Sequence, residues 1–336
     1  MSGETADLLE RLQSRVSAEL ADLAGQPFAL VDFPDHANVG DSAIWLGTTA
    51  YFRRQHRVEP RYVASIRAFS PAALRRAHPE GPIVIHGGGN FGDLWPRHQA
   101  FRERLLETFG DRLIVQLPQT VFYQDSRLAD RTARVIARHG NVRLLVRDQP
   151  SLDFAAGRFD CPVRLCPDMA LCLGPMARPA PPTVDVLCLF RTDRERAASH
   201  ELPPGRLEVA VADWLHESRV SVRLRELGAV LAGLRSTDRG TSGLRLDRYE
   251  AAASARVARG CRLLSSGRVV VTDRLHAHLL CLLLGIPHAA LDNTYGKLGR
   301  FLDAWTGAAP EVHRVATAEE ALAWAENARY VSRAVW

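Results

Sequence analysis

Short apolar runs alternate with longer segments of helical periodicity from Phe28 onward. The runs are rich in valine, isoleucine and leucine, which is typical of parallel strands that are buried on both faces. Six strands are predicted in the first half of the chain, at 28–33, 61–65, 82–86, 112–117, 142–146 and 163–167. Helices are predicted between them, at 42–55, 71–77, 98–109, 125–139 and 150–156. This alternation predicts a doubly wound parallel sheet.

A proline-dense stretch, GPMARPAPPT at 174–183, interrupts the pattern, and we interpret it as a linker between domains. Four more strands are predicted after it, at 184–190, 206–214, 268–273 and 287–292. Their helices are predicted at 221–234, 249–265, 275–284 and 298–305, with a closing helix at 318–330. The predicted fold class is therefore α/β, with two Rossmann-like doubly wound domains, 1–176 and 183–336, facing each other across a cleft.

The composition is that of an ordinary globular protein, with 46% hydrophobic and 24% charged residues among 336. The net charge of +5 suits an anionic ligand, whereas no basic run interleaved with aromatic residues and no zinc-finger or RNA-binding motif indicates nucleic acid. The six cysteines include no Cys-x-x-Cys pair and are expected to be reduced core residues. No set of ligands has the spacing of a dedicated metal site, so no metal is expected.

The first 25 residues carry apolar side chains at helical spacing and lack the features of a secretory signal, so they predict an amphipathic helix. The longest apolar stretch elsewhere, 279–286, falls far short of the roughly 20 residues that cross a bilayer. The arginine-rich segment 219–248 matches no motif, and we interpret it as a surface that faces a substrate or a membrane. The expected location is the cytoplasm, including the inner face of the membrane through peripheral association.

Two loops of the first half follow predicted strands, where ligands of doubly wound sheets bind. The sequence NVGDS places Asn38 and Asp41 as candidates for acceptor contacts, with Asp41 as the candidate base, although a capped helix start explains them equally well. The sequence HGGGN places Gly88, Gly89 and Asn90 where a ligand can approach the backbone, with a tight interdomain loop as the alternative. Neither ATP nor NAD is expected, because the glycine spacing matches neither nucleotide fingerprint.

Basic and histidine side chains follow other predicted strands. Arg147 can hold a carboxylate or phosphate with two parallel hydrogen bonds, unless it forms a surface pair with Asp148. In TDRLHAH, Arg274 and His276 together favour an anion site with a proton donor. His276 and His278 are two residues apart and cannot share a helix face, so one is expected to face the cleft and His278 to be a packing residue.

The sequence DNTYGKLGRF follows the strand predicted at 287–292 and carries Asn293, Tyr295, Lys297 and Arg300. Lys297 is a candidate for phosphate contact, with a solvated helix start as the alternative. Besides Asp41, three more side chains near strand ends are candidates for a catalytic base, and spacing alone does not rank them: His86, Asp93 and Asp148.

The motifs stand along the chain in the order NVGDSAI, HGGGNFGD, LPQT, VRDQPS, CPDMAL, TDRLHAH and DNTYGKLGRF. This set resembles the polysaccharide pyruvyl transferase family, and the resemblance spans Asp35 to Arg300 and hence both predicted domains. It implies a glycosyltransferase-B-like arrangement, with residues 1–176 on the acceptor side and 183–336 on the phosphoenolpyruvate side. It also implies transfer of pyruvate from phosphoenolpyruvate onto two hydroxyls of a sugar as a ketal, with release of phosphate.

By this resemblance the donor site comprises Arg147, Arg274, Leu275 and His276, with Leu275 contributing its backbone and Lys297 at a nearby basic position. Phosphoenolpyruvate carries a carboxylate and a phosphate, so arginines from both domains would balance its charge. His276 suits the general acid that protonates the enol carbon. Phosphoenolpyruvate is thus a substrate, no cofactor is expected, and the acceptor would be a saccharide or a lipid-linked or nucleotide-linked sugar of a cell-surface glycan.

Two other functions remain compatible with the fold, because fold alone does not fix function. One is a glycosyltransferase that consumes a sugar nucleotide. The other is a sugar-binding partner of envelope-assembly enzymes without catalysis of its own. The presence of Arg147, Arg274 and His276 argues against the second of these.

Overall fold

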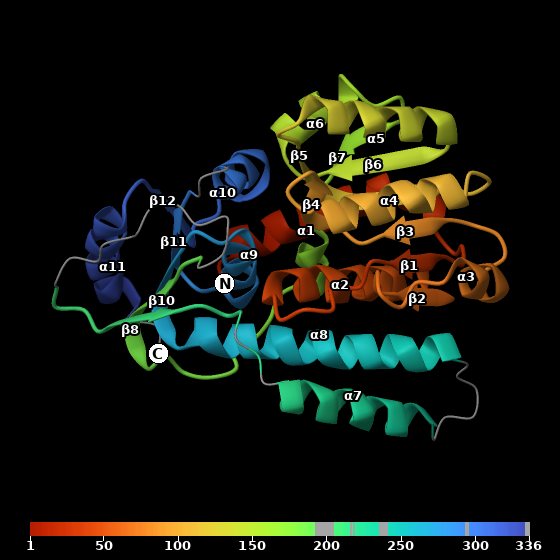
Figure 1. The fold of residues 1–336 in the computed structure, drawn as a ribbon. Coiled ribbons are helices and arrows are strands. Elements are labelled where there is room, and N and C mark those ends of the chain that lie inside the picture. Colours follow the sequence, from red (N-terminus) through yellow and green to blue (C-terminus); the bar gives the residue numbers. More distant parts are fainter. Residues whose placement is uncertain (192–204, 216, 218, 235–240, 293–295, 333–336) are drawn as a thin grey trace.

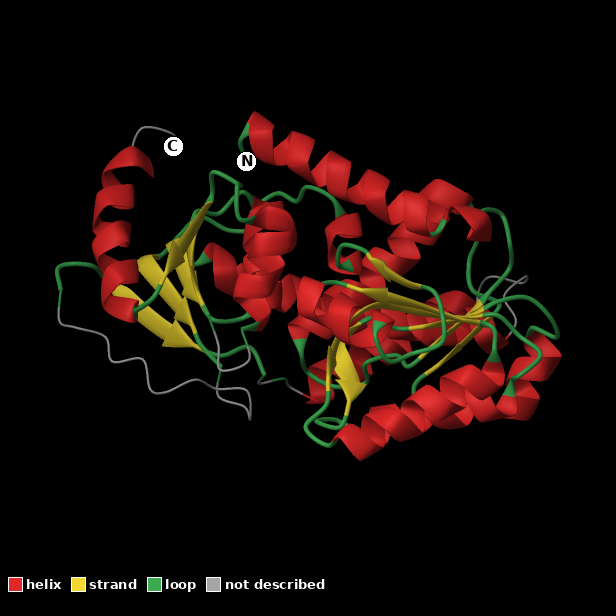
Figure 2. Ribbon diagram, turned by 90° about the horizontal axis from the view of Figure 1, so that it is seen from above, coloured by secondary structure: helices red, strands yellow, loops and turns green. Residues whose placement is uncertain are grey.

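The computed structural model describes residues 1–191, 205–215, 217, 219–234, 241–292 and 296–332. Two sheets, one in each half of the chain, are built from parallel strand pairs and flanked by helices (Figures 1 and 2). The predicted α/β class with two parallel-sheet domains is confirmed. The arrangement is consistent with two Rossmann-like domains.

The first sheet has the strand order β2-β1-β3-β5-β6-β7, and β4 pairs with β5 outside this path. Its strands are β1 (Ala29–Val31), β2 (Tyr62–Ala64), β3 (Ile83–Ile85), β4 (Gly88–Gly92), β5 (Ile114–Phe122), β6 (Val142–Val146) and β7 (Val163–Leu165). The helices of this half are α1 (Gly3–Glu19), α2 (Val39–Tyr51), α3 (Pro71–Ala77), α4 (Pro96–Thr108), α5 (Ser126–His139) and α6 (Gln149–Ala156). Shorter helical turns lie at Ala21–Leu23, Phe52–His56 and Met169–Leu173.

The second sheet has the order β12-β11-β10-β8-β9. Its strands are β8 (Val184–Leu189), β9 (Val209–Ala212), β10 (Gly267–Thr272), β11 (His288–Leu291) and β12 (Val312–Val315). The helices of this half are α7 (Arg219–Leu234), α8 (Thr241–Ser265), α9 (Leu275–Leu284), α10 (Lys297–Phe301) and α11 (Ala318–Ser332), with a further turn at Leu302–Thr306.

Both sheets change their direction of winding beside their first strand. β1 lies between β2 and β3, and β8 lies between β9 and β10. In doubly wound sheets, ligands bind beyond the carboxyl ends of the strands at such a point. The loops that follow β1 and β10, which lead to Asn38 and Arg274, are therefore placed at the ligand-binding edges of the two sheets.

The structure differs from the sequence prediction at two strands. The glycine-rich segment Gly88–Gly92, predicted as a loop, forms β4 and pairs in parallel with the end of β5. Glycine provides no side chain to pack, so its sequence carries no strand signal. The edge strand β12, with the sequence VHRV, was not predicted, because its central residues are polar and only half of it is apolar.

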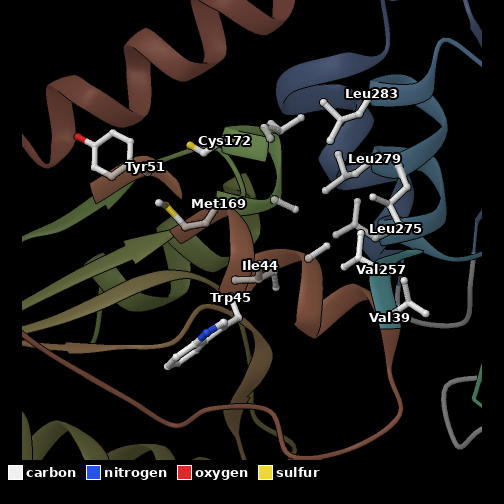
Figure 3. Packing of buried hydrophobic residues seen from close by; sticks show 14 of the residues in the cluster. Val39, Ile44, Trp45, Tyr51, Met169, Cys172, Val257, Leu275, Leu279 and Leu283 are labelled. Atoms are coloured by element: carbon white, nitrogen blue, oxygen red, sulfur yellow. The ribbon is translucent and has the colours of Figure 1, made fainter. Parts of the chain in front are cut away.

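An apolar core joins the two halves of the molecule (Figure 3). Leu275 and Leu279 of α9 face Ile44 of α2 and Met169 of the turn Met169–Leu173, and all four side chains are buried. Burying a leucine side chain contributes about 1.5–3 kcal/mol, so this contact holds the helices that carry the loop residues. The position of α9 against α2 is thus fixed by packing and not by the linker alone.

Helix α8 follows the linker in sequence but packs against α2 of the first half (Figure 1). The ring of Tyr249 stacks on Phe33 with centroids 3.9 Å apart, and its hydroxyl accepts a hydrogen bond from the Ser65 N–H at 3.1 Å. The C-terminal end of α8 leads into β10 of the second sheet. The domain boundaries 1–176 and 183–336 stay a prediction, because α8 contacts both halves.

All six cysteines are unpaired thiols, and all except Cys161 are buried, as the sequence predicted. The N-terminal amphipathic helix is also present as α1, which buries Leu9, Leu12 and Val16. Among the described residues, no helix combines the length and the apolar character that a bilayer-spanning segment needs.

Buried histidines make the folded state sensitive to acid. Burial lowers the pKa of His86 and of His288 from 6.5 to about 4 in each case. Between pH 6.5 and 4 the unfolded chain binds more protons than the folded one, so stability is full above pH 6.5 and falls as the pH decreases toward 4. Each of these histidines lowers the free energy of unfolding by up to about 1.4 kcal/mol for every pH unit of acidification between pH 6.5 and 4. In denaturant titrations between pH 6.5 and 4, we expect His86→Leu to reduce the slope of the unfolding free energy against pH by up to about 1.4 kcal/mol per pH unit. An unchanged slope would contradict the lowered pKa of His86.

Candidate functional site

A cavity of about 410 Å³ lies at the carboxyl ends of strands from both sheets. It is lined by residues of both halves: His36, Asn38, Asp41, Gly89, Asn90, Trp95, His98, Arg147, Arg191, Trp214, Leu215, Arg274, Leu275, His276 and Lys297. Eight of the predicted contact residues and the predicted proton donor line this cavity: Asn38, Asp41, Gly89, Asn90, Arg147, Arg274, Leu275, Lys297 and His276, whereas Gly88 does not. Its permanent charges are those of three arginines and one lysine against a single carboxylate, Asp41, so the cavity suits an anion.

Arg147 follows β6 and is held by an ion pair inside the protein. Its Nη1 donates to Oδ2 of Asp168 at 2.6 Å, and its Nε donates to the Thr120 hydroxyl at 3.0 Å. The side chain is only 3% exposed, and its partner is Asp168, so the alternative of a surface pair with Asp148 is wrong. Trp305 of the second half donates its indole N–H to the Arg147 carbonyl at 2.9 Å, which ties this strand end to the second domain.

Asp168 connects Arg147 with His276 across the two halves. His276 Nε2 lies 3.5 Å from Asp168 Oδ2, and the Ala170 N–H donates to Oδ1 at 2.9 Å. Burial alone would raise the pKa of Asp168, but His276 and Arg147 outweigh it and hold that pKa well below its ordinary value of 3.8. Asp168 is therefore an anion at neutral pH and orients the side chains of Arg147 and His276 at the cavity wall.

Arg274 is fixed from the second domain. It is the N-cap residue of α9, its backbone N–H donates to the Thr272 hydroxyl at 3.1 Å, and its side chain is 3% exposed. Nη2 donates to Oδ1 of Asp213 at 2.7 Å, and the guanidinium lies 5.8 Å from the centre of the Trp214 ring. These contacts hold the arginine in one orientation, which lowers the entropic cost of binding an anion.

Gly89 is the point at which cations of the two domains approach each other. A methyl group at this position would lie 3.1 Å from Arg147 Nη2 and 3.5 Å from Lys297 Nζ. Lys297 begins α10 in the second domain and is buried. A side chain at residue 89 would thus occupy the space between the two cations, so the glycine keeps it open. Asn293 and Tyr295, predicted on the same loop as Lys297, lie outside the described residues.

Asn38 and Asp41, at the start of α2, belong to the first-domain wall of the cavity. Asn38 is the N-cap of α2, accepting from the Gly40 N–H at 3.0 Å, and its Nδ2 donates to Asp41 Oδ2 at 2.8 Å. The suggested capping role thus belongs to Asn38 and not to Asp41. Burial would raise the pKa of Asp41, but His36 and His276 outweigh it and lower this pKa below its ordinary 3.8.

Gly40 allows His276 to lie directly against α2. A side chain at Gly40 would overlap the His276 imidazole ring, so the absence of one sets the position of that ring. His276 is 13% exposed and reaches the cavity, whereas His278 is fully buried. His278 Nδ1 lies 2.7 Å from His288 Nε2, and its Nε2 lies 2.8 Å from the Thr306 hydroxyl. The predicted division between a cavity-facing and a packing histidine is confirmed.

A second histidine–aspartate contact reaches the cavity, and it was not predicted from the sequence. His98 of α4 lines the cavity, and its Nδ1 lies 3.1 Å from Oδ1 of the buried Asp32. Asp32 directly follows β1 and has a φ of 71°, a left-handed conformation that is uncommon for a residue other than glycine. Asn90 Nδ2 lies 3.2 Å from the same ring nitrogen. In the sequence, this contact could have been inferred only from an aspartate at the end of a predicted strand and a histidine at the start of a predicted helix.

The remaining candidates for a base do not line the cavity. His86 is buried next to Trp45, with ring centroids 6.0 Å apart. Asp93 accepts from the backbone N–H groups of the loop after β5, and Asp148 caps α6 and accepts from Ser151. Within the described ranges, no group of three or more histidine, cysteine or acidic side chains could hold a metal ion.

Comparisons with known proteins show which sequences this chain is similar to. The profile of the family described as polysaccharide pyruvyl transferase matches residues 38–295. Pyruvyl transferase 1 of Schizosaccharomyces pombe is 34% identical over 297 residues, which cover 82% of this chain and 69% of that protein. The Bacillus subtilis protein named "Putative pyruvyl transferase EpsO" is 31% identical over 290 residues, covering 84% of this chain and 87% of that protein.

A solved structure supports the fold. A functionally uncharacterized protein of Klebsiella pneumoniae aligns with a TM-score of 0.53 at 17% identity, over 94% of this chain and 100% of that chain. At this identity the likeness concerns the fold alone. The family profile, in contrast, spans the cavity residues from Asn38 to His276, and the two named relatives are similar over most of both chains. The resemblance indicated by the motifs is therefore confirmed, and the chain belongs to the polysaccharide pyruvyl transferase family.

Proposed function

We propose that the protein transfers the pyruvyl group of phosphoenolpyruvate onto two hydroxyls of one sugar, forming a ketal and releasing phosphate. The observation that carries the proposal is the cavity in which Arg147 of one domain and Arg274 and His276 of the other meet. Family membership supports a transferase of polysaccharide biosynthesis. A glycosyltransferase-B-like division, with the acceptor on the side of residues 1–176, is part of the proposal.

The donor fits the cationic part of the cavity. Phosphoenolpyruvate has two anionic groups close together, and burying them requires positive partners on more than one side. Arg147 and Lys297 come within contact range of Gly89, and Arg274 is fixed by Asp213. Leu275, the first residue of α9, offers its backbone N–H at a helix N-terminus, where anions bind favourably.

The reaction needs a proton at the methylene carbon of the donor. In the proposed sequence, His276 gives a proton to that carbon, and one sugar hydroxyl attacks the adjacent carbon that bears the phosphate. The C–O bond to phosphate then breaks, and the second hydroxyl attacks the same carbon to close the ketal ring. Two hydroxyl protons are released: one restores His276, and the base takes up the other and passes it to the departing phosphate, so that protons balance.

His98 is the residue we assign as the base for the acceptor. In the tautomer of His98 that carries its proton on Nδ1 and donates it to Asp32, Nε2 keeps its lone pair and can accept a hydroxyl proton. Asp41, the base predicted from the sequence, has a lowered pKa and is therefore a weaker acceptor of protons. Asn38, Asp41 and Asn90 then serve as hydrogen-bonding partners of the sugar.

The proposal is tested with purified protein, phosphoenolpyruvate and a panel of saccharides. Phosphate release is expected only when a suitable saccharide is present, and mass spectrometry should find one pyruvyl group on the sugar with both hydroxyls consumed. Turnover of a sugar nucleotide without response to phosphoenolpyruvate would favour the glycosyltransferase alternative. Binding of a saccharide without turnover of either donor would favour a non-catalytic sugar-binding partner.

The His98 assignment predicts a specific loss. His98→Gln is expected to reduce kcat by roughly 10²-fold or more, because glutamine keeps the hydrogen bonds but cannot take up the proton. Asp32→Asn should lower kcat as well and shift its pH dependence, since the tautomer of His98 is no longer fixed. The matched control is Trp95→Phe at the rim of the same cavity, which removes no titrating group. Wild-type kcat in His98→Gln would return the role of base to Asp41.

A further inference from the structure

Helix α7 presents an apolar stripe to solvent. Four of its side chains are among the most exposed large hydrophobic residues described: Val220 at 68%, Leu224 at 65%, Leu227 at 55% and Leu231 at 53%. Their spacing of four, three and four residues places them within about 60° of one another around the helix, over about three turns. Isolated exposed leucines are ordinary, but a continuous stripe marks an interaction surface.

The stripe lies on the outside of the molecule. Helix α7 packs on α8, and α8 in turn packs on α2, so α7 forms the outermost of three helical layers (Figure 1). Because α8 covers its inner side, the stripe is the side turned away from the protein. No part of the described chain covers it, since all four side chains are more than half exposed.

Positive charge flanks the stripe. Arg223 and Arg225 are both exposed: at about 100° per residue, Arg223 lies about 40° from Leu227 at one edge of the stripe, and Arg225 lies about 100° from Leu224 at the other. The one acidic residue of α7, Glu226, is half-buried and lines a second cavity together with Arg223. An amphipathic helix with leucines on one side, arginines beside them and no exposed acid has the composition of helices that lie in the plane of a membrane surface. The arginines would meet the negative headgroups of anionic lipids.

A second copy of the chain is a poorer match to this surface. The stripe covers an area roughly 16 Å long and 10 Å wide, whereas a stable protein interface buries about 800 Å² on each partner. Exposed arginines on both sides would also meet the same charges of a second copy. An anionic bilayer has neither restriction, because its acyl chains accept a narrow apolar helix side and its headgroups neutralise the arginines.

We propose that α7 docks this protein on the surface of an anionic membrane through Val220, Leu224, Leu227 and Leu231. The docking would bring the site close to the lipid headgroups. The second cavity, about 700 Å³ in volume and lined in part by Arg223 and Glu226, shares His36 and Leu215 with the cavity of the candidate site. If the proposed function holds, the acceptor sugar attached to a lipid would reach His98 and His276 along this route.

Vesicle sedimentation tests the docking without any substrate. The protein is expected to bind vesicles made of phosphatidylglycerol and phosphatidylcholine, and not to bind vesicles made only of phosphatidylcholine. Added salt should weaken the binding. Leu224→Asp combined with Leu227→Asp should reduce the bound fraction roughly tenfold or more. The matched control is Leu128→Asp, which charges an exposed leucine of α5 outside the stripe and should bind as wild type.

A second readout locates the contact. In a Cys161→Ser background, which removes the one cysteine that is not buried, an environment-sensitive fluorophore at Leu224→Cys should shift to the blue with anionic vesicles, and one at Leu128→Cys should not. Equal vesicle binding by the Leu224→Asp/Leu227→Asp protein, no blue shift, or a concentration-dependent dimer that this double variant abolishes would each overturn the proposal. Phosphate release with a soluble saccharide should be unchanged in the double variant, so a failure of docking and a failure of the proposed chemistry are distinguishable.

Discussion

His276→Gln is expected to lower kcat by roughly 10²–10⁴-fold while the KM for phosphoenolpyruvate changes little. Glutamine fills a volume close to that of imidazole and retains polar atoms, so the cavity walls stay in place. It cannot supply a proton near neutral pH, and the step that protonates the enol carbon loses its donor. Steady-state phosphate release with a saturating saccharide measures both parameters.

His278→Gln is the matched control for this experiment. The residue lies on the same helix, two positions away, but it is buried against His288 and Thr306 and does not line the cavity. Its replacement should lower stability and leave kcat per folded molecule close to wild type. A similar loss of kcat in both variants would mean that α9 packing, and not a proton from His276, limits the reaction.

The position of Arg274 and His276 could be predicted from the sequence because their location follows from strand geometry. All strands of a parallel sheet present their carboxyl ends at one edge, so a charged residue directly after an apolar run lies at that edge. The same reasoning placed Arg147 after β6, and the structure brings these side chains to one cavity. The two parallel sheets themselves followed from the uninterrupted apolar strands.

The partners of these residues could not be predicted in the same way. Asp168 and Asp213 come from chain segments that precede Arg274 by many residues, and only tertiary packing brings them to Arg147 and Arg274. The pairing of His98 with Asp32 likewise depends on how α4 packs beside β1. Strand β4 was not predicted, because its glycines have no side chains and so show no alternation of apolar and polar residues. Spacing along a sequence predicts which edge a residue occupies, whereas partners across elements depend on packing.

Asp168→Asn is the variant for which the structure predicts the largest combined loss. The carboxylate is 1% exposed, accepts from Arg147 Nη1 at 2.6 Å and lies 3.5 Å from His276 Nε2. Removing its charge leaves Arg147 buried without an anion, and breaking a buried pair in this way costs about 3–5 kcal/mol. The free energy of unfolding and the affinity for phosphoenolpyruvate should both decrease, because Arg147 is then able to turn away from the cavity.

Asp22→Asn provides the matched comparison, since Asp22 also pairs with an arginine, Arg143, but is 53% exposed. Such surface pairs contribute about 0–1 kcal/mol, so its unfolding free energy should change by no more than that. Denaturant titrations of both variants should therefore differ by several kcal/mol, and only Asp168→Asn should raise the KM for phosphoenolpyruvate. If the two variants are equally stable and equally active, Asp168 does not hold Arg147 and His276 in place. The bound donor itself would then order Arg147 and His276, and the two side chains would take up these positions only when phosphoenolpyruvate enters the cavity.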